Sequence, residues 1–370
     1  MFSAFIKFQK GVLMKPSGIG GQAVLEGIMM KNKDKYAVAV RKPDNEIAVD
    51  VKDCKSLADK HKIFSVPFIR GVFAFIESLV IGIKTLTYSA EFYEDEPEPK
   101  EKPVDKVTKK MFKEKAEDFL MGITVLVSVA FSVLLFIVLP YGISELLKNG
   151  MNIRSNTILA VVEGIIRILI FVLYIFLISR MKDIQRTFMY HGAEHKCINC
   201  IENGYELNTE NVLKSSRIHK RCGTSFLFFV VFISIVCFIL VSFALPKNIS
   251  IPMKAFVRLL LVPVIAGISY EILRKAGKSE SKFMNIISKP GMWMQKLTTK
   301  EPDVSMVEVA IVAVEAVFDW KKFLEDNATD FEFTTEDNIE VDIETNEFDT
   351  IDVDFDDEDD IEEFKSKSEE

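Results

Sequence analysis

The chain has 370 residues, of which 49% are hydrophobic, and a formal net charge of −8. The charge is unevenly spread, because residues 325–370 hold 22 acidic and two basic side chains, so the other 324 residues carry +12. The chain is too long for a small scaffold held together by disulfides, and its five cysteines are an odd number, so we exclude that class of protein. We therefore expect a basic body followed by an acidic, disordered C-terminal tail, residues 325–370.

The N-terminal region, residues 1–64, is predicted to be cytoplasmic and to contain a small β-hairpin. In "YAVAVRKPDNEIAVDV", residues 36–51, apolar residues alternate on both sides of a Pro-Asp-Asn turn. The preceding "GIGGQAVLEGIMM", residues 18–30, is rich in glycine but matches neither the P-loop nor the dinucleotide-binding fingerprint. The first 21 residues lack the apolar core and the cleavage site of a secretory signal peptide.

Residues 65–92 are apolar enough for a membrane helix but carry Arg70, Glu77 and Lys84 at intervals of seven. A helix with one polar stripe suits the membrane interface, so we predict an interfacial or re-entrant helix. Residues 93–117, charged and broken by prolines, are expected to be a linker.

Four segments within residues 118–274 predict a four-helix membrane domain, and hence a mainly α, polytopic membrane protein. Two of them, residues 119–139 and 223–245, hold no charged residue and are long enough to cross a bilayer. The other two, residues 158–179 and 255–273, are apolar but contain charges that need partners. Glu163 and Arg167 are four residues apart and can pair on one helical face.

Loop charges predict the orientation of these helices. The loop at 180–222 holds eight Lys and Arg residues, whereas the two short connections hold two each. The positive-inside rule therefore places this loop and both termini in the cytoplasm, with cytoplasmic amphipathic helices at 275–324. In that reducing compartment cysteines are expected to be thiols or metal ligands.

The stretch "YHGAEHKCINC", residues 190–200, lies in this loop and has the pattern of a metal site. His191-x-x-Glu194-His195 follows the H-x-x-E-H order of inverted zinc peptidases, in which both histidines bind zinc and the glutamate activates water. That chemistry needs neutral imidazoles on the ion and an unligated carboxylate as the base. We therefore predict a divalent metal, zinc, on His191 and His195, with Glu194 as the catalytic residue.

The third metal ligand decides between catalysis and structure. Glu271, near the end of the fourth span, would leave the open position that a catalytic zinc keeps. His219 and Cys222 would instead complete a closed, structural site with the two histidines. Cys197 and Cys200 form a C-x-x-C, but Cys197 follows His195 too closely to share its helical face. A metal-free polar cluster at the membrane surface is the third alternative.

Several short stretches of this sequence occur together in a known family. "GGQAVLEGIMM", "YHGAEHK", "HKRCGTSF", "GISYE" and "PGMWMQKLTTKEP" resemble the YqhQ-like family of bacterial membrane proteins (DUF1385), over residues 17–318. The resemblance implies a multi-pass protein of the bacterial inner membrane and a metal-dependent enzyme whose reaction is not known.

Two functions follow as hypotheses. The first is a metal-dependent hydrolase acting at the cytoplasmic face on a membrane-associated substrate. The second is a non-catalytic scaffold or assembly factor that meets a protein partner and is braced by the same residues. In both, the lipid bilayer is a partner and a homo-oligomer is compatible with the sequence. Nucleic acid is not expected, because no binding module accompanies the basic residues.

Overall fold

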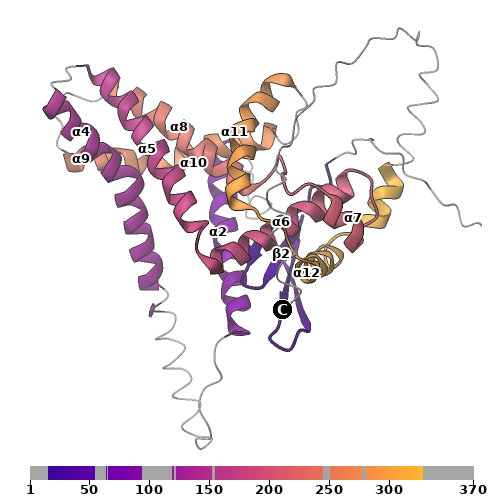
Figure 1. Cartoon of the computed structure of the whole chain (residues 1–370). Coiled ribbons are helices and arrows are strands. Elements are labelled where there is room, and N and C mark those ends of the chain that lie inside the picture. Colours follow the sequence, from indigo (N-terminus) through magenta and orange to yellow (C-terminus); the bar gives the residue numbers. More distant parts are fainter. Residues whose placement is uncertain are drawn as a thin grey trace, which may run out of the picture. The chain divides into compact units, whose positions relative to one another are not determined.

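The structure is a computed structural model that describes residues 16–54, 64, 66–93, 119–120, 122–151, 155–244, 251–276 and 281–327 (Figure 1). These residues all belong to the first of the two units into which the chain divides, Met1–Asn327. They are mainly helical, with one small antiparallel sheet. Nearly all of the predicted acidic tail and nearly all of the predicted linker lie outside the described residues.

Four strands form an antiparallel sheet in the order β1-β2-β3-β4, namely Gly20–Val24, Gly27–Asn32, Lys35–Arg41 and Ile47–Asp53. The predicted hairpin is confirmed as β3–β4, with Ala39 opposite Val49. The glycine-rich stretch before it forms a second hairpin, β1–β2, that the sequence did not predict. Its turn is tight, since Val24 pairs with Gly27 and Glu26 adopts the left-handed backbone conformation, φ 48°.

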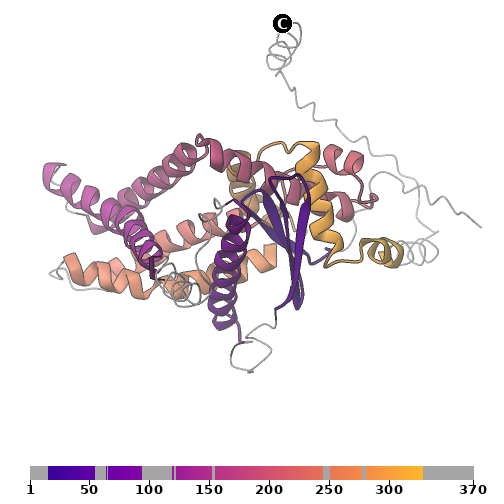
Figure 2. The same ribbon diagram turned by 90° about the horizontal axis from the view of Figure 1, so that it is seen from below.

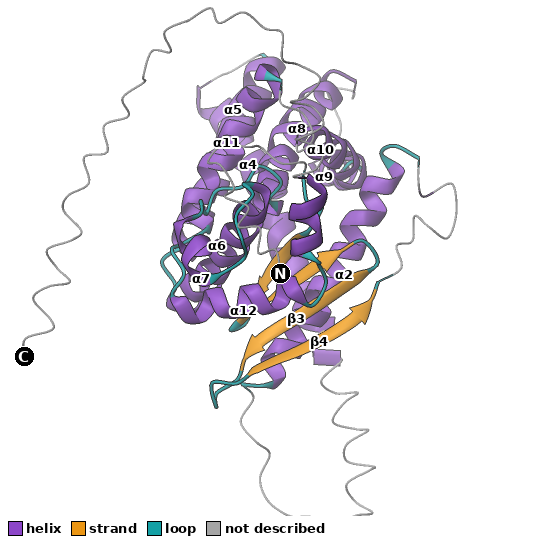
Figure 3. Ribbon diagram, turned by 90° about the vertical axis from the view of Figure 1, so that its right-hand side faces the viewer, coloured by secondary structure: helices purple, strands orange, loops and turns teal. Residues whose placement is uncertain are grey.

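Helices cover both faces of this sheet. Ile28 and Met30 of β2 pack with α6 (Lys182–Glu202) and α12 (Val304–Glu315). The intervening Met29 points to the opposite face, where it packs with Val38 and with Ile81 of α2 (Ile69–Glu91). Figure 2 shows the sheet between α2 and α12, and Figure 3 shows the strands beside α6 and α12. This alternation with period two fixes which side of the sheet faces the histidine helix α6.

Among the described residues, four helical segments are long and apolar enough to cross a membrane, which confirms the predicted number. They are Gly122–Lys148, Ile158–Ile178, Gly223–Val241 and Phe256–Ala276. Within the described residues α2 is not among them, so its interfacial position remains a prediction.

The helices of the membrane domain are interrupted in two places. The first span contains a π-helical turn, η2 (Leu134–Val138), and continues as α4 (Leu139–Met151). The second and third spans lie in α5 (Asn156–Ile178) and α8 (Gly223–Ala244). The fourth is divided into α9 (Ile251–Leu260) and α10 (Val262–Ala276), where Pro263 follows the break. Two further helices are α7 (Thr209–Lys214) and α11 (Lys282–Thr298).

A buried ionic cluster joins these spans. The predicted pair is confirmed, with Arg167 Nη2 donating to Glu163 Oε1 at 2.7 Å. Arg258 of α9 binds both oxygens of the same carboxylate, at 2.6 and 2.8 Å. Arg167 also donates to the carbonyl of Phe136 in η2, and both guanidinium groups lie over the ring of Phe238. Every buried charge in the cluster therefore has a partner, as the apolar setting requires.

Candidate metal centre

His191, His195 and Cys222 form a candidate metal-binding group. The histidines are one turn apart on α6, so their rings lie on one face with centroids 4.4 Å apart. Cys222 comes directly before α8, and one ligand atom from each residue lies within 4.8 Å of the other two. His195 and Cys222 are buried and His191 is half-buried. Among the described residues no other group of three or more His, Cys, Asp or Glu meets this condition.

Backbone carbonyls orient both imidazoles. His191 Nδ1 donates to the carbonyl of Thr298 at 2.9 Å, and His195 Nδ1 donates to that of Arg217 at 2.6 Å. A carbonyl only accepts, so each Nδ1 carries the hydrogen and each Nε2 keeps its lone pair. Histidine ligands of metals in proteins have this arrangement, with the ring nitrogen that does not bind metal donating to a carbonyl or carboxylate.

The two Nε2 atoms converge near Cys222. His191 Nε2 lies 3.1 Å from Cys222 Sγ. His195 Nε2 is buried and has no hydrogen-bond partner among the described residues. Burial lowers the pKa of His195 against the opposing effect of the nearby Cys222 thiol, which favours the neutral, ligating imidazole. A buried nitrogen without a partner is costly in a protein, and a metal ion would satisfy it.

Gly192 explains how Thr298 reaches His191. A Cβ atom at position 192 would lie 2.0 Å from the carbonyl oxygen of Lys300. The absence of a side chain lets the backbone after α11 approach α6, where Lys300 N donates to Phe188 O at 2.9 Å. The glycine inside the HxxEH pattern is therefore a packing requirement of the site.

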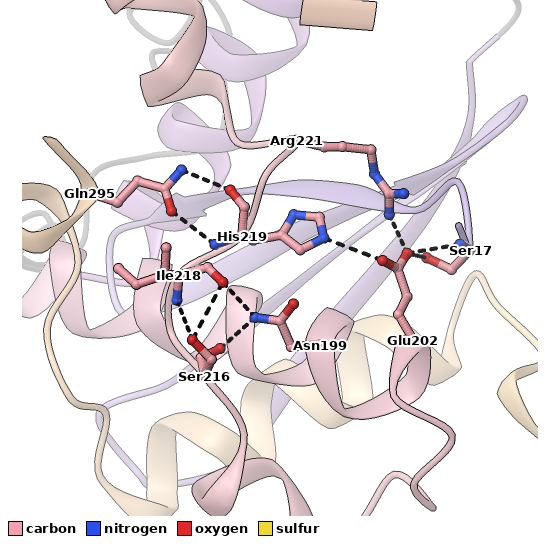
Figure 4. Close-up of polar contacts among 8 residues, drawn as sticks. All are labelled: Ser17, Asn199, Glu202, Ser216, Ile218, His219, Arg221 and Gln295. Atoms are coloured by element: carbon pink, nitrogen blue, oxygen red, sulfur yellow. Dashed lines mark hydrogen bonds and ion pairs between the residues drawn. The ribbon is translucent and has the colours of Figure 1, made fainter. Parts of the chain in front are cut away.

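Side-chain amides hold the segment that carries Arg217 and Cys222 (Figure 4). Asn199 Nδ2 donates to the carbonyls of Ser216 and Ile218, at 2.6 and 2.9 Å. Gln295 of α11 accepts from His219 N at 2.9 Å and donates to His219 O at 2.8 Å. Residues 216–219 are thus fixed by protein contacts alone.

His219 is close to the group but is directed elsewhere. Its ring centroid lies 5.8 Å from that of His195, and its Nε2 faces Glu202 Oε2 at 3.4 Å (Figure 4). Glu202 also binds Arg221 and the backbone and hydroxyl of Ser17. Burial alone would raise the pKa of Glu202, but these partners outweigh it and lower the pKa to about 2. The structure therefore pairs His219 with a carboxylate, and the predicted closed site with four ligands is not assembled.

Glu271, the other predicted third ligand, is paired with Arg70 of α2. Arg70 Nε and Nη2 donate to its two oxygens at 2.6 and 2.5 Å. Gly71, next in the chain, packs closely on α10, since a Cβ there would lie 3.1 Å from Gly267 Cα. The structure thus uses Glu271 to join α2 to α10 and leaves Cys222 as the third member of the metal group.

Glu194 lies on α6 between the two histidines in sequence and is 5% exposed. Its Oε1 accepts from Gly21 N of β1 at 3.0 Å. A Cβ at position 21 would lie 2.5 Å from Met29 O and 3.1 Å from Glu194 Cδ, so only glycine fits between β2 and this carboxylate. Burial raises the pKa of Glu194, opposed by the smaller effect of His191. A raised pKa brings a carboxylate nearer to the pH at which it works as a general base.

Gly21 is one of the residues of this site that the sequence did not indicate. The available signal was the glycine-rich stretch at 18–21, whose role was left open. Its structural role is now clear, because β1 places a backbone N–H on the predicted catalytic carboxylate.

A cavity of about 800 Å³ opens beside the group. The three members of the group line it together with Glu194. Its other walls come from β1 and β2, from α2, and from the ends of α8 and α10 that adjoin the sheet. Cavities of this size hold small-molecule ligands.

The C-x-x-C cysteines lie apart from the metal group. Cys197 and Cys200 are fully buried in the core between α6, α12 and the sheet, and Cys200 Sγ lies 3.4 Å from Glu206 O. Burial raises the pKa of both thiols, to about 12 for Cys200. Both cysteines therefore serve packing in this fold.

Comparisons with known proteins find related sequences but give no reaction. Residues 66–320 match the model of a family described as "Protein of unknown function (DUF1385)". The chain is similar to "Uncharacterized protein YqhQ" of Bacillus subtilis (strain 168), with 34% identity over 306 residues, which is 80% of this chain and 91% of that protein. No solved structure matches the chain.

Proposed function

The chain belongs to the DUF1385 family, and from that premise and the geometry of the metal group we propose that it is a membrane-embedded, metal-dependent hydrolase. It acts at the cytoplasmic face of the bacterial inner membrane, with both termini in the cytoplasm. The charge of the 180–222 loop and the four candidate spans support this placement.

The observation that carries the proposal is the unsatisfied Nε2 of His195. It is buried, its ring is fixed by the carbonyl of Arg217, and it is directed toward the group that includes His191 and Cys222. A folded protein rarely leaves a buried nitrogen unpaired unless an ion or ligand completes the site. Two imidazoles and one thiolate are a donor set that suits zinc.

Three protein ligands also match the requirement of catalysis. Zinc is four-coordinate, and a site with three protein ligands keeps one position for water or substrate. When bound, zinc supplies Lewis-acid chemistry, polarising a carbonyl or phosphoryl oxygen and acidifying water.

Glu194 has the properties of the base that such chemistry needs. It is buried and not part of the metal group, and among the described residues its one hydrogen bond comes from Gly21 N to Oε1. Oε2 is thus left to accept a proton from an attacking water, while Gly21 holds the carboxylate in place. The cavity beside it would admit the substrate.

The test is the metal content and activity of the detergent-purified protein. We expect about one zinc per chain, lost in His195→Ala and Cys222→Ser and retained in Glu271→Gln, which serves as the matched control. Glu194→Gln should retain zinc and abolish hydrolysis. Zinc-free wild-type protein prepared without chelators would overturn the proposal.

A non-catalytic scaffold is the second candidate, because one observation favours it. Asn199 and Gln295 brace the 216–219 segment without help from a metal, so the loop could present a fixed surface to a partner. In that case Glu194→Gln would leave cellular function intact, whereas Gln295→Ala, which removes the brace, would impair it. Loss of cellular function in Glu194→Gln supports the hydrolase.

A further inference from the structure

We propose that the cavity beside the metal group binds an anionic phosphate ester carried by a membrane lipid. Binding of this ligand follows from the residues that line the cavity. Only its hydrolysis rests on the proposed function. The proposal rests on one observation. Unpaired cations, an apolar wall and the metal group line the same cavity, at the ends of two membrane spans.

The position of the cavity points to the level of the lipid head groups. Leu227 and the residues before it line the cavity at the start of the span Gly223–Val241. Tyr270 and Leu273 line it near the end of the span Phe256–Ala276. The sheet supplies the opposite wall. A ligand in the cavity would therefore lie where these helices leave the apolar layer, which is where a head group lies.

The charges lining the cavity favour an anion. Lys31, Lys33, Arg221 and Arg274 line it against one acidic residue, Glu194. Lys31 and Arg221 are already paired with Glu77 and Glu202. Within the described part of the chain, Lys33 and Arg274 have no hydrogen bond or ion pair, and both are exposed. Two unpaired cations beside a metal group suit a group with more than one negative charge and several acceptor oxygens, as a phosphate ester has.

The rest of the lining distinguishes a lipid from a soluble phosphate. Leu227 and Leu273 of the two spans, with Ile81 of α2, form an apolar wall of the cavity. Inorganic phosphate or a small sugar phosphate would leave this wall in contact with water. A glycerolipid covers it with the first part of its acyl chains and gains free energy in proportion to the apolar area buried.

Hydrolysis of such an ester consumes one water. The hydroxyl of the water bonds to phosphorus, the ester P–O bond breaks, and the proton of the water ends on the departing alcohol oxygen. Glu194 is placed to carry that proton, since it lines the same cavity.

The experiment is calorimetric titration of the zinc-loaded, detergent-purified full chain with three probes below their micelle concentrations. Dihexanoyl phosphatidic acid carries both parts, glycerol 3-phosphate only the phosphate, and dihexanoylglycerol only the apolar part. The test variant is Lys33→Gln with Arg274→Gln, two exposed residues whose change should not unfold the chain. The matched control is Lys35→Gln with Lys275→Gln, exposed neighbours outside the cavity lining.

We expect phosphatidic acid to bind at least about tenfold more tightly than either partial probe, because its apolar and ionic contacts add. The test variant should weaken this binding by about tenfold, and the control by less than about twofold, since two ionic contacts are lost only in the former. Unchanged zinc content and melting temperature in both variants show that they fold.

Each other outcome has a defined meaning. Equal affinity for glycerol 3-phosphate and phosphatidic acid would overturn the lipid assignment, and binding that ignores Lys33 and Arg274 would overturn the site. Zinc-loaded protein that binds none of the probes refutes this proposal and leaves the hydrolase standing. Zinc-free wild type that still binds phosphatidic acid through these cations refutes the hydrolase and leaves the lipid site standing.

Discussion

Replacing Gly192 by alanine should weaken zinc binding although the side chain touches no metal ligand. The new Cβ would lie 2.0 Å from Lys300 O, whereas ordinary contacts begin near 3.4 Å, so the backbone around Lys300 must retreat by roughly 1.4 Å. The bond from His191 Nδ1 to Thr298 O, now 2.9 Å, would then exceed hydrogen-bonding distance. The bond from Lys300 N to Phe188 O would be lost with it.

The magnitude follows from these contacts. Overpacking costs about 1–3 kcal/mol, and each of the two lost hydrogen bonds adds about 1 kcal/mol, so the free energy of unfolding should fall by about 3–5 kcal/mol. Loss of the carbonyl that orients a histidine ligand lowers metal affinity by about 10- to 100-fold. Zinc affinity would be measured by competition with a chromogenic chelator, and stability by thermal unfolding followed through tryptophan fluorescence.

The matched control is Gly223→Ala, which adds the same methyl group beside Cys222. A Cβ at position 223 meets nothing within 4 Å, so this variant should keep the wild-type zinc affinity and melting temperature. Wild-type zinc affinity in Gly192→Ala would refute the reasoning, because it would show that the Thr298 carbonyl does not orient His191.

Three further predictions concern the ionic cluster, an acid-sensitive carboxylate and the cysteines. Glu163→Gln should lower the free energy of unfolding in detergent by about 3–5 kcal/mol, since two buried arginines lose their counter-ion. The depressed pKa of Glu202, about 2, contributes stability that is complete above the unfolded value near 4.5 and is lost as pH falls from there toward 2. In Glu202→Gln, the denaturant concentration at the midpoint of unfolding should therefore change less with pH in that range. Elemental analysis should find zinc in Cys200→Ala and none in Cys222→Ala, because only Cys222 belongs to the metal group.

Each of these has its own control. Glu145→Gln removes a carboxylate paired with Lys148 near the end of the first span, and should cost less than about 1 kcal/mol because that pair is partly exposed. Glu210→Gln removes an exposed carboxylate, and its unfolding midpoint should depend on acid pH as that of the wild type does. A Glu163→Gln protein as stable as Glu145→Gln, an unchanged acid profile in Glu202→Gln, or zinc loss in Cys200→Ala would each contradict the corresponding explanation.

Local patterns predicted the elements of this protein well. The four spans follow from uninterrupted apolar length, and the β3–β4 hairpin follows from alternation around its turn. The Glu163–Arg167 pair and the shared face of His191 and His195 follow from helical spacing. These are contacts between residues no more than four apart on a helix, so the sequence contains all the information they need.

Contacts between distant segments could not be predicted in the same way. Gly21 meets Glu194 across 173 residues, and Arg70 meets Glu271 across 201. Three candidates for the third ligand were equally compatible with the sequence, and only the arrangement of α2, α10 and the 216–219 segment favours Cys222. The glycines at 21 and 192 were visible as residues, but the backbone and carboxylate that approach them come from elsewhere in the chain.

The way in which the metal group is built also bears on its role. Structural zinc sites supply folding free energy, and small domains that depend on them unfold when the metal is removed. Here backbone carbonyls orient both imidazoles. Asn199 and Gln295 hold the segment before Cys222 (Figure 4). Because these contacts involve no metal, we predict that the site keeps its shape when the metal is removed, as the proposed catalytic role requires.

Removal of zinc by a chelator should therefore leave the protein folded. Its free energy of unfolding should fall only by the amount that ligand linkage requires, about 2.7 kcal/mol at a free zinc concentration 100 times the dissociation constant. Limited proteolysis would test the loop directly, since residues 203–222 should stay as resistant in the zinc-free protein as in the zinc-loaded one. Selective cleavage there after chelation, reversed by added zinc, would show that the metal holds the loop, and the site would then be structural. Gln295→Ala is the positive control, because it removes the brace on His219 and should expose the same segment whether or not zinc is bound.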